Sequence, residues 1–207
     1  MKKANNSFDE IMEWVLSAET IALAGHTNPD GDAIGACLAL GGALEKAGKQ
    51  VQVILEKYAD KYQLIPNGHL VCAAEDARLP ELFLALDCGD EGRLGEAAEI
   101  FRRAAKKINI DHHVSNTGTG DINLVEPQIG STCEVLYDLF DGEKLDREIA
   151  KALYIGIIHD TGVFQYSNTT PETLKKGAEL ISYGFDFPRM IQETFYQKTY
   201  VQTQIMG

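Results

Sequence analysis

Residues 20–35 have the sequence TIALAGHTNPDGDAIG and establish a pattern that the rest of the chain repeats. The first five, Thr20–Ala24, form an apolar run typical of a buried strand, and a helix that Gly48 ends is predicted over residues 32–47. Between strand and helix lies a polar turn. In an open parallel sheet, ligands bind beyond the carboxyl ends of the strands, so this turn lies where a site is expected.

The same alternation of apolar and amphipathic runs continues on both sides of this unit. Further strands are predicted at residues 50–55, 82–86 and 107–110, and further helices at 7–18, 96–105, 131–140, 146–158, 171–183 and 187–200. Residues 58–77 fit no single element apart from a turn at 66–68. The alternation predicts an α/β fold with a Rossmann-like, open, mainly parallel five-stranded sheet flanked by helices.

The composition is that of a globular protein with an acidic surface. The 207 residues include 19 Lys+Arg and 31 Asp+Glu, which gives a formal net charge of −12, and 44% are hydrophobic. This balance argues against a protein that coats duplex nucleic acid by charge, since counterion release needs a basic surface. The chain shows neither a secretory signal nor a run near the roughly 20 apolar residues of a membrane span, which predicts a cytoplasmic protein without a membrane partner.

Cysteine spacing argues against two further classes. The four cysteines, Cys37, Cys72, Cys88 and Cys133, include no CxxC pair. A disulfide framework or a zinc ribbon is therefore not expected, and free buried thiols are predicted instead.

Four segments place carboxylate or imidazole groups after an apolar run. They contain His26, Asp30 and Asp32; Asp87; Asp111, His112 and His113; and Asp160. For two of these carboxylates a purely structural role is an alternative, because Asp32 or Asp87 can cap a helix. Adjacent histidines favour a functional site, since neighbours in an extended chain point opposite ways, so that one can bind metal while the other meets substrate.

Taken together, the segments predict one dinuclear metal site in which Asp87 bridges the two ions. The predicted ligands are His26, Asp30, Asp32, Asp87, His112 and Asp160. Mixed carboxylate and imidazole ligands suit Mn²⁺ best, with Mg²⁺, Co²⁺, Fe²⁺ or Zn²⁺ as alternatives. Two such ions activate water and stabilise the leaving oxygen at phosphorus, which predicts phosphoester hydrolysis without a covalent intermediate.

The chain resembles the DHH phosphoesterase superfamily over essentially its whole length. The four signature motifs occur in order: HTNPDGDAIG from His26, LALDCGD from Leu84, IDHHVSN from Ile110 and GIIHDTGVFQYSNT from Gly156. Their wording is most similar to the bifunctional oligoribonuclease/pAp phosphatase (NrnA-type) branch. The resemblance implies hydrolysis of short single-stranded RNA oligonucleotides (nanoRNA) and of 3′-phosphoadenosine 5′-phosphate (pAp).

The resemblance also implies a role for each site residue. One metal would be held by His26 and Asp30, the other by Asp32, His112 and Asp160, and both by Asp87. His113 would contact the scissile phosphate, and Asp111 would orient an imidazole. Asn28 and Asn168 would line the substrate site.

The chain departs from the family pattern in two residues and in its length. His159 stands where a small polar residue is usual, and Gln165 where arginine is common. Family members carry a second, DHHA1-type domain with a glycine-rich motif that grips substrate, and this sequence lacks that motif. We expect residues 1–186 to form the catalytic domain and residues 187–207 a linker helix to an absent domain, so that the chain binds Mn²⁺ but hydrolyses substrate weakly.

Alternative functions stay open at this point. Related enzymes act on cyclic dinucleotides or on pyrophosphate, and motif wording alone separates them from the NrnA-type branch. A reading from another class is a catalytically weak metal- or nucleotide-binding fragment, whose signature would be the loss of one of the six predicted ligands. A homodimer is a possible assembly.

Overall fold

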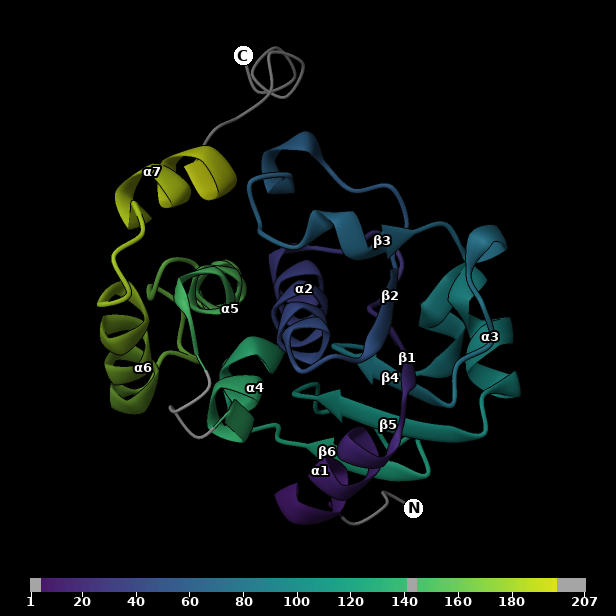
Figure 1. The fold of residues 1–207 in the computed structure, drawn as a ribbon. Coiled ribbons are helices and arrows are strands. Elements are labelled where there is room, and N and C mark those ends of the chain that lie inside the picture. The colour runs from purple at the N-terminus through teal and green to yellow at the C-terminus, as the bar shows by residue number, and fades with distance from the viewer. Residues whose placement is uncertain (1–4, 141–144, 197–207) are drawn as a thin grey trace.

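The computed structural model describes residues 5–140 and 145–196 and confirms the α/β class (Figure 1). Within these residues, six strands form one open sheet in the order β3-β2-β1-β4-β5-β6, and every neighbouring pair is parallel. Their bounds are Thr20–Ala24 (β1), Gln50–Ile54 (β2), Val71–Cys72 (β3), Leu82–Leu86 (β4), Lys106–Asp111 (β5) and Ile122–Val125 (β6).

The described sheet has six strands where five were predicted, because both edge strands give weak sequence signals. β3 is only two residues long and lies in the stretch that fitted no single element. β6 contains Asn123 within its apolar run, which hides the strand pattern. The Asn123 amide is buried but satisfied locally, since it accepts from the backbone nitrogen of Gly120 at 2.9 Å and donates to its carbonyl at 3.0 Å.

Each predicted helix overlaps an observed one. The helices are Phe8–Ser17 (α1), Gly31–Lys46 (α2), Ala98–Arg103 (α3), Thr132–Phe140 (α4), Arg147–Asp160 (α5), Pro171–Ile181 (α6) and Phe187–Ile191 (α7). Short turns of 3₁₀ helix lie at Asp60–Tyr62 (η1), Gly68–Leu70 (η2), Ala74–Asp76 (η3) and Glu91–Ala97 (η4), and a π-helical turn lies at Gln192–Tyr196 (η5). The predicted helix 187–200 is therefore α7 followed by η5, and residues 197–200 lie outside the described part of the chain.

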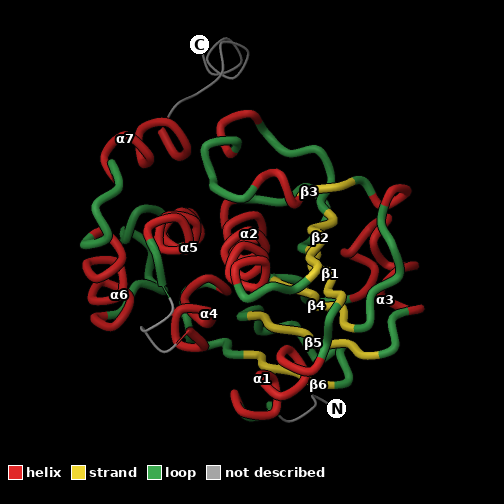
Figure 2. Tube along the Cα trace, viewed as in Figure 1, coloured by secondary structure: helices red, strands yellow, loops and turns green. Residues whose placement is uncertain are grey.

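The helices form layers on the two sides of the sheet (Figures 1 and 2). α3 covers one face and α2 and α4 cover the other, with α5 packed against α2 and α6 further out. Successive residues of a strand point to opposite faces of the sheet, so each strand contributes side chains to both cores. In β4, Leu84 faces the large core shared with α2, α4 and α5, whereas Phe83 contacts Phe101 of α3 at a ring-centroid distance of 5.2 Å.

Aspartates fix where the two central helices begin. The Oδ1 atom of Asp30 accepts hydrogen bonds from the backbone nitrogens of Asp32 and Ala33 at 2.9 and 3.1 Å, so that Asp30 is the cap of α2. The alternative in which Asp32 caps this helix is wrong, because Asp32 lies in the first turn. Asp146 caps α5 in the same way.

Two glycines let α2 and α5 cross closely. A Cβ atom on Gly35 would lie 2.7 Å from the carbonyl oxygen of Ala152, and one on Gly156 would lie 2.6 Å from Oδ1 of Asp32. Both distances are too short for packed atoms, so a side chain at either position would push the helices apart. The close crossing brings the start of α2 next to the end of α5, where Asp160 lies.

The cysteine and membrane expectations can also be compared with the described residues. All four cysteines are unpaired; Cys37, Cys88 and Cys133 are buried and Cys72 is partly buried, which confirms the prediction of free thiols. None of the described helices combines the length and the apolar character that crossing a bilayer requires.

Candidate metal centre

The four polar segments come together at the carboxyl edge of the sheet. The side chains follow β1 (His26), β4 (Asp87) and β5 (His112), begin α2 (Asp30 and Asp32) and end α5 (Asp160). Three groups have all their donor atoms within 4.8 Å of one another: His26, Asp30 and Asp87; Asp32, His112 and Asp160; and Asp87, His112 and His113. The structure thus brings all six predicted ligands together, and we call the first two groups the first and second donor groups.

In the first donor group, a buried imidazole lies between two carboxylates. Nε2 of His26 lies 3.7 Å from Oδ2 of Asp30 and 3.6 Å from Oδ2 of Asp87. Nδ1 lies 2.8 Å from the carbonyl oxygen of Thr27, which can only accept, so Nδ1 carries the hydrogen. Burial opposes the charged ring, but the two carboxylates outweigh it and raise the pKa of His26 to about 10.

In the second donor group, a ring nitrogen is surrounded by carboxylate oxygens. Nε2 of His112 lies 2.9 Å from Oδ2 of Asp160 and 3.9 Å from Oδ2 of Asp32. This nitrogen is buried and makes no hydrogen bond with any residue in the described ranges. Burial, together with the charges of Asp87 and Asp160, holds the pKa of Asp32 well above its ordinary range.

Asp87 connects the two donor groups. Its Oδ1 lies 3.6 Å from Nε2 of His112, while its Oδ2 lies 3.6 Å from Nε2 of His26. The hydroxyl of Thr132, whose role was not predicted, donates to Oδ1 at 3.0 Å. Asp87 has a φ of 51°, a conformation that costs energy for a residue other than glycine and clusters at functional sites. One oxygen toward each group is the arrangement that a shared ligand requires.

The first backbone N–H groups of α4 hold Asp32 in place. The nitrogen of Thr132 donates to Oδ2 at 2.6 Å and that of Cys133 donates to Oδ1 at 2.9 Å. A helix N-terminus stabilises negative charge, so these bonds orient a carboxylate that is 0% exposed.

The donor atoms fit divalent metal ions. Four carboxylates and two imidazoles converge here, and no described lysine or arginine forms an ion pair with any of the four carboxylates. Buried carboxylates without a cation are costly, and so is the buried Nε2 of His112 without a partner. A cation in each donor group would relieve both costs. Mixed carboxylate and imidazole ligands are typical of Mn²⁺, Fe²⁺ and related ions.

His113 lies beside the second donor group and is oriented by Asp111. Nδ1 of His113 donates to Oδ1 of Asp111 at 2.7 Å, and this bond raises the pKa of His113. The His113 side chain is 34% exposed, so its Nε2 is the ring nitrogen left to meet a ligand. Burial disfavours the Asp111 carboxylate, yet the bonds from His113 and Asn116 outweigh it and lower the pKa of Asp111.

Two buried asparagines that support this site were not predicted. Nδ2 of Asn116 donates to Oδ2 of Asp111 at 2.6 Å and to Oδ1 of Asn109 at 2.8 Å. Asn109 in turn donates to the carbonyl oxygens of Ala85 and Cys88, both at 3.2 Å, and so ties β5 to the end of β4. The available signal was the polar Asn109 inside the apolar strand KINI, residues 107–110.

Asn28 and Asn168, the predicted substrate ligands, have different surroundings. Asn28 is exposed in the turn between His26 and Asp30, with a φ of 51°. Nδ2 of Asn168 donates to the carbonyl oxygens of Gly130 at 3.0 Å and Asp160 at 3.1 Å, so this amide braces the chain at the end of α5. Because Nδ2 of Asn168 is occupied by these two bonds, any contact of Asn168 with substrate would be made by Oδ1. Substrate binding by Asn28 and by Asn168 stays a prediction.

His159 fills space beside the site and stays neutral. Its ring lies 5.1 Å from that of Tyr62 and 5.5 Å from that of Phe195, and the Tyr62 hydroxyl lies 3.3 Å from its Nδ1. Burial, with a smaller effect of Lys61, lowers the pKa of His159 to about 4. The structure gives this residue a packing role.

Comparison with known families shows to which family this fold and its candidate metal centre belong. The family described as DHH family, N-terminal domain, matches residues 20–157. The match runs from β1 through most of α5 and contains every candidate ligand except Asp160. The chain belongs to the DHH family.

Individual relatives agree with this assignment. The bifunctional oligoribonuclease and PAP phosphatase NrnA of Thermus thermophilus is 35% identical over 79% of this chain and 50% of that protein. The Bacillus subtilis protein of the same name is 27% identical over 91% of this chain and 61% of that protein. The crystal structure of an exopolyphosphatase-related protein from Bacteroides fragilis has a TM-score of 0.89 at 26% identity, and covers 97% of this chain and 63% of that one. The chain thus spans between 50% and 63% of the length of these relatives.

Proposed function

We propose that this chain carries the catalytic centre of a manganese-dependent phosphoesterase that hydrolyses short single-stranded RNA oligonucleotides and pAp. The position of Asp87 carries the proposal, because one oxygen faces His112 and the other faces His26, each 3.6 Å away. The substrate assignment is supported by the two NrnA relatives, which are both named as oligoribonuclease and PAP phosphatase.

In this proposal each donor group holds one divalent ion. His26 and Asp30 bind the first, Asp32, His112 and Asp160 bind the second, and Asp87 is shared. Bound there, the pair of ions supplies water activation and neutralises the charge that develops at phosphorus. The N–H groups of α4 keep the Asp32 carboxylate oriented before the ions bind.

His113 then binds the scissile phosphate. Its Nδ1–H is held by Asp111, which favours the charged ring and turns Nε2 outward as a hydrogen-bond donor. A donor placed where negative charge develops lowers the barrier to phosphoryl transfer. Asp111 acts through His113 and is a positioning residue.

Hydrolysis of pAp and of the dinucleotide pApA, with Mn²⁺ titrated, tests the proposal. We expect Mn²⁺-dependent release of phosphate from pAp and of AMP from pApA, with cyclic di-AMP and pyrophosphate as poorer substrates. Asp87→Asn should abolish this activity. Asp90→Asn is the matched control, since Asp90 is exposed, lies outside both donor groups and caps η4, a role that asparagine can also fill.

Three outcomes would change the proposal. Activity that survives in Asp87→Asn would reject the dinuclear site. A preference for cyclic di-AMP or pyrophosphate would replace the substrate assignment but keep the site.

We further propose that residues 1–186 are the catalytic domain and residues 187–207 a linker to a substrate-holding domain, so rapid hydrolysis of RNA by this 207-residue chain would contradict that division.

A further inference from the structure

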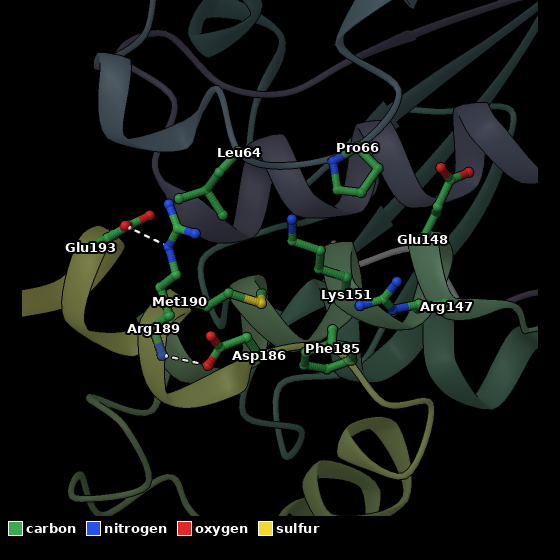
Figure 3. Close-up of a pocket in the computed structure, with 10 residues that line it drawn as sticks. All are labelled: Leu64, Pro66, Arg147, Glu148, Lys151, Phe185, Asp186, Arg189, Met190 and Glu193. Atoms are coloured by element: carbon green, nitrogen blue, oxygen red, sulfur yellow. Dashed lines mark hydrogen bonds and ion pairs between the residues drawn. The ribbon is translucent and has the colours of Figure 1, made fainter.

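A second concave site lies away from the metal centre, between α5, α7 and the segment before η2. The cavity has a volume of about 400 Å³, enough for a nucleotide-sized ligand. Three basic residues line it: Arg147 and Lys151 on α5 and Arg189 on α7. Figure 3 shows Lys151 extending toward Leu64 and Pro66, with Arg147 and Arg189 on either side of it. The lining also contains three carboxylates, Glu148, Asp186 and Glu193, so what the cavity can bind depends on which charged groups are already paired.

Each of the three carboxylates in the lining has a partner among the described residues. Oε1 of Glu193 pairs with Nε of Arg189 at 2.7 Å, and Oδ1 of Asp186 accepts from the backbone nitrogen of Arg189 at 3.1 Å. Oε2 of Glu148 pairs with Nζ of Lys46 at 2.9 Å. None of these carboxylates forms an ion pair with Arg147 or Lys151, the two cations of α5.

Arg147 and Lys151 are the uncompensated cations. Neither side chain forms a hydrogen bond or an ion pair with any residue in ranges 5–140 and 145–196. Burial, then the charges of Arg147 and Arg189, lower the pKa of Lys151. The carboxylates of Glu193 and Glu148 oppose this shift but do not outweigh it.

The rest of the lining is apolar. Leu64, Pro66, Phe185 and Met190 form a wall next to the cations. A cavity with an apolar wall and a few cationic groups is suited to an organic phosphate, because arginine pairs with phosphate oxygens and the wall shelters the organic part.

We infer that this cavity is a second phosphate-binding site, which takes the phosphate group of a small ester of nucleoside monophosphate size. Arg147 and Lys151 bind the phosphate oxygens, with Arg189 at the edge. Lys151 lies nine residues before Asp160 on α5, or about 14 Å along the helix, so one phosphate cannot contact both sites. The inference does not depend on the proposed function.

Two segments of the cavity wall also carry aromatic rings that lie beside the candidate metal centre. Leu64 comes two residues after Tyr62, and Glu193 two residues before Phe195, and both aromatic rings pack on His159 beside Asp160.

Calorimetric titration of the 207-residue chain with AMP tests the inference. EDTA is present throughout, so that metal ions cannot hold the phosphate at the metal centre. We expect saturable binding of AMP, weaker binding of inorganic phosphate and none of adenosine. Lys151→Gln and Arg147→Ala should each weaken AMP binding about tenfold, the loss of one charge-assisted hydrogen bond.

Arg103→Ala is the matched control, because Arg103 is an exposed arginine on α3, on the far side of the sheet (Figure 1). It should bind AMP as the unchanged chain does. A second readout uses NMR of the lysine amino groups, in which AMP should raise the pKa of Lys151.

One outcome would change the ligand assigned to this cavity, and three would reject the phosphate-binding site. Binding of pApA without binding of AMP would assign the phosphate to an oligonucleotide and keep the site. Absence of saturable binding by either ligand, equal affinity for AMP in Lys151→Gln and the unchanged chain, or binding of adenosine as tight as that of AMP would each overturn the inference.

Discussion

Nε2 of His112 lies 2.9 Å from Oδ2 of Asp160, although one residue follows β5 and the other ends α5. The nitrogen is buried and makes no hydrogen bond with a described residue. Burial, with repulsion from Asp87, raises the pKa of the Asp160 carboxyl despite the nearby imidazole. An imidazole nitrogen and a carboxylate oxygen that face each other in this way fit two ligands of one cation.

The first prediction follows from that pair and concerns Asp160→Asn. Without metal, the variant should be at least as stable as the unchanged chain, because it removes a charge from among other carboxylates. With Mn²⁺ at a hundred times the dissociation constant, the unchanged chain should gain about 2.7 kcal/mol, and the variant much less. Thermal melting with and without Mn²⁺ measures both. An unchanged gain in the variant would exclude Asp160 as a ligand.

The second prediction separates catalysis from metal binding at His113. His113→Ala should lower kcat about 100-fold or more, as expected for a group that acts on the reacting phosphate. Its affinity for Mn²⁺ should stay within about threefold of the unchanged chain, because the proposal makes the neighbouring His112, and not His113, the ligand. Steady-state kinetics with a Mn²⁺ titration measures both quantities, and a large loss of Mn²⁺ affinity would make His113 a ligand instead.

The third prediction concerns the crossing of α2 and α5. Gly35→Ala would place a methyl group 2.7 Å from the carbonyl oxygen of Ala152 on α5, and should lower the free energy of unfolding by about 1–3 kcal/mol. Gly68→Ala is the control, since a Cβ atom there meets nothing within 4 Å and should change stability by less than about 1 kcal/mol. Urea unfolding compares the two, and equal effects would show that the crossing is not tight.

The fourth prediction is a dependence of stability on pH at the start of α5. Burial disfavours the Asp146 carboxylate, but Lys46 and the backbone N–H groups of Glu148 and Ile149 outweigh it and lower its pKa. A depressed pKa contributes stability above the ordinary pKa of about 3.9, and that stability is lost as pH falls through the folded-state value.

Asp146→Asn keeps the helix cap but removes the charge. At pH 7 the unchanged chain should be more stable by up to about 1 kcal/mol, a modest gain because Lys46 and Asp146 are each 44% exposed. The difference should shrink as pH falls below about 4. Melting curves across this pH range measure the difference in stability between the unchanged chain and the variant. A difference that stays constant with pH would show that the Lys46–Asp146 ion pair is not its source.

The sequence predicts the parts of the fold whose local patterns are strong. The apolar runs of β1 and β4 and the glycine that ends α2 mark these elements without tertiary information. Edge strands are different: β3 has two residues, and Asn123 interrupts β6. Both depend on pairing with a neighbour, which local pattern does not encode.

The candidate site likewise contains some residues that the sequence pattern predicts and others that it does not. Its carboxylates and imidazoles are visible because each follows an apolar run, as Asp87 does. Their supports are not visible in this way. Thr132 meets Asp87 from the start of α4, far along the chain, and Asn116 is close to Asp111 in sequence but meets it only because the loop between them folds back. Hydrogen-bond partners of this kind are set by packing in three dimensions rather than by sequence spacing.

The central claim is that Asp87 is shared by two metal ions. Electron paramagnetic resonance of the chain loaded with Mn²⁺ tests it most directly, because two ions about 3.5–4 Å apart are coupled through their spins. The account predicts two equivalents of Mn²⁺ per chain with a coupled spectrum, and loss of the coupling in Asp87→Asn. A single equivalent with the spectrum of isolated Mn²⁺ in the unchanged chain would contradict it.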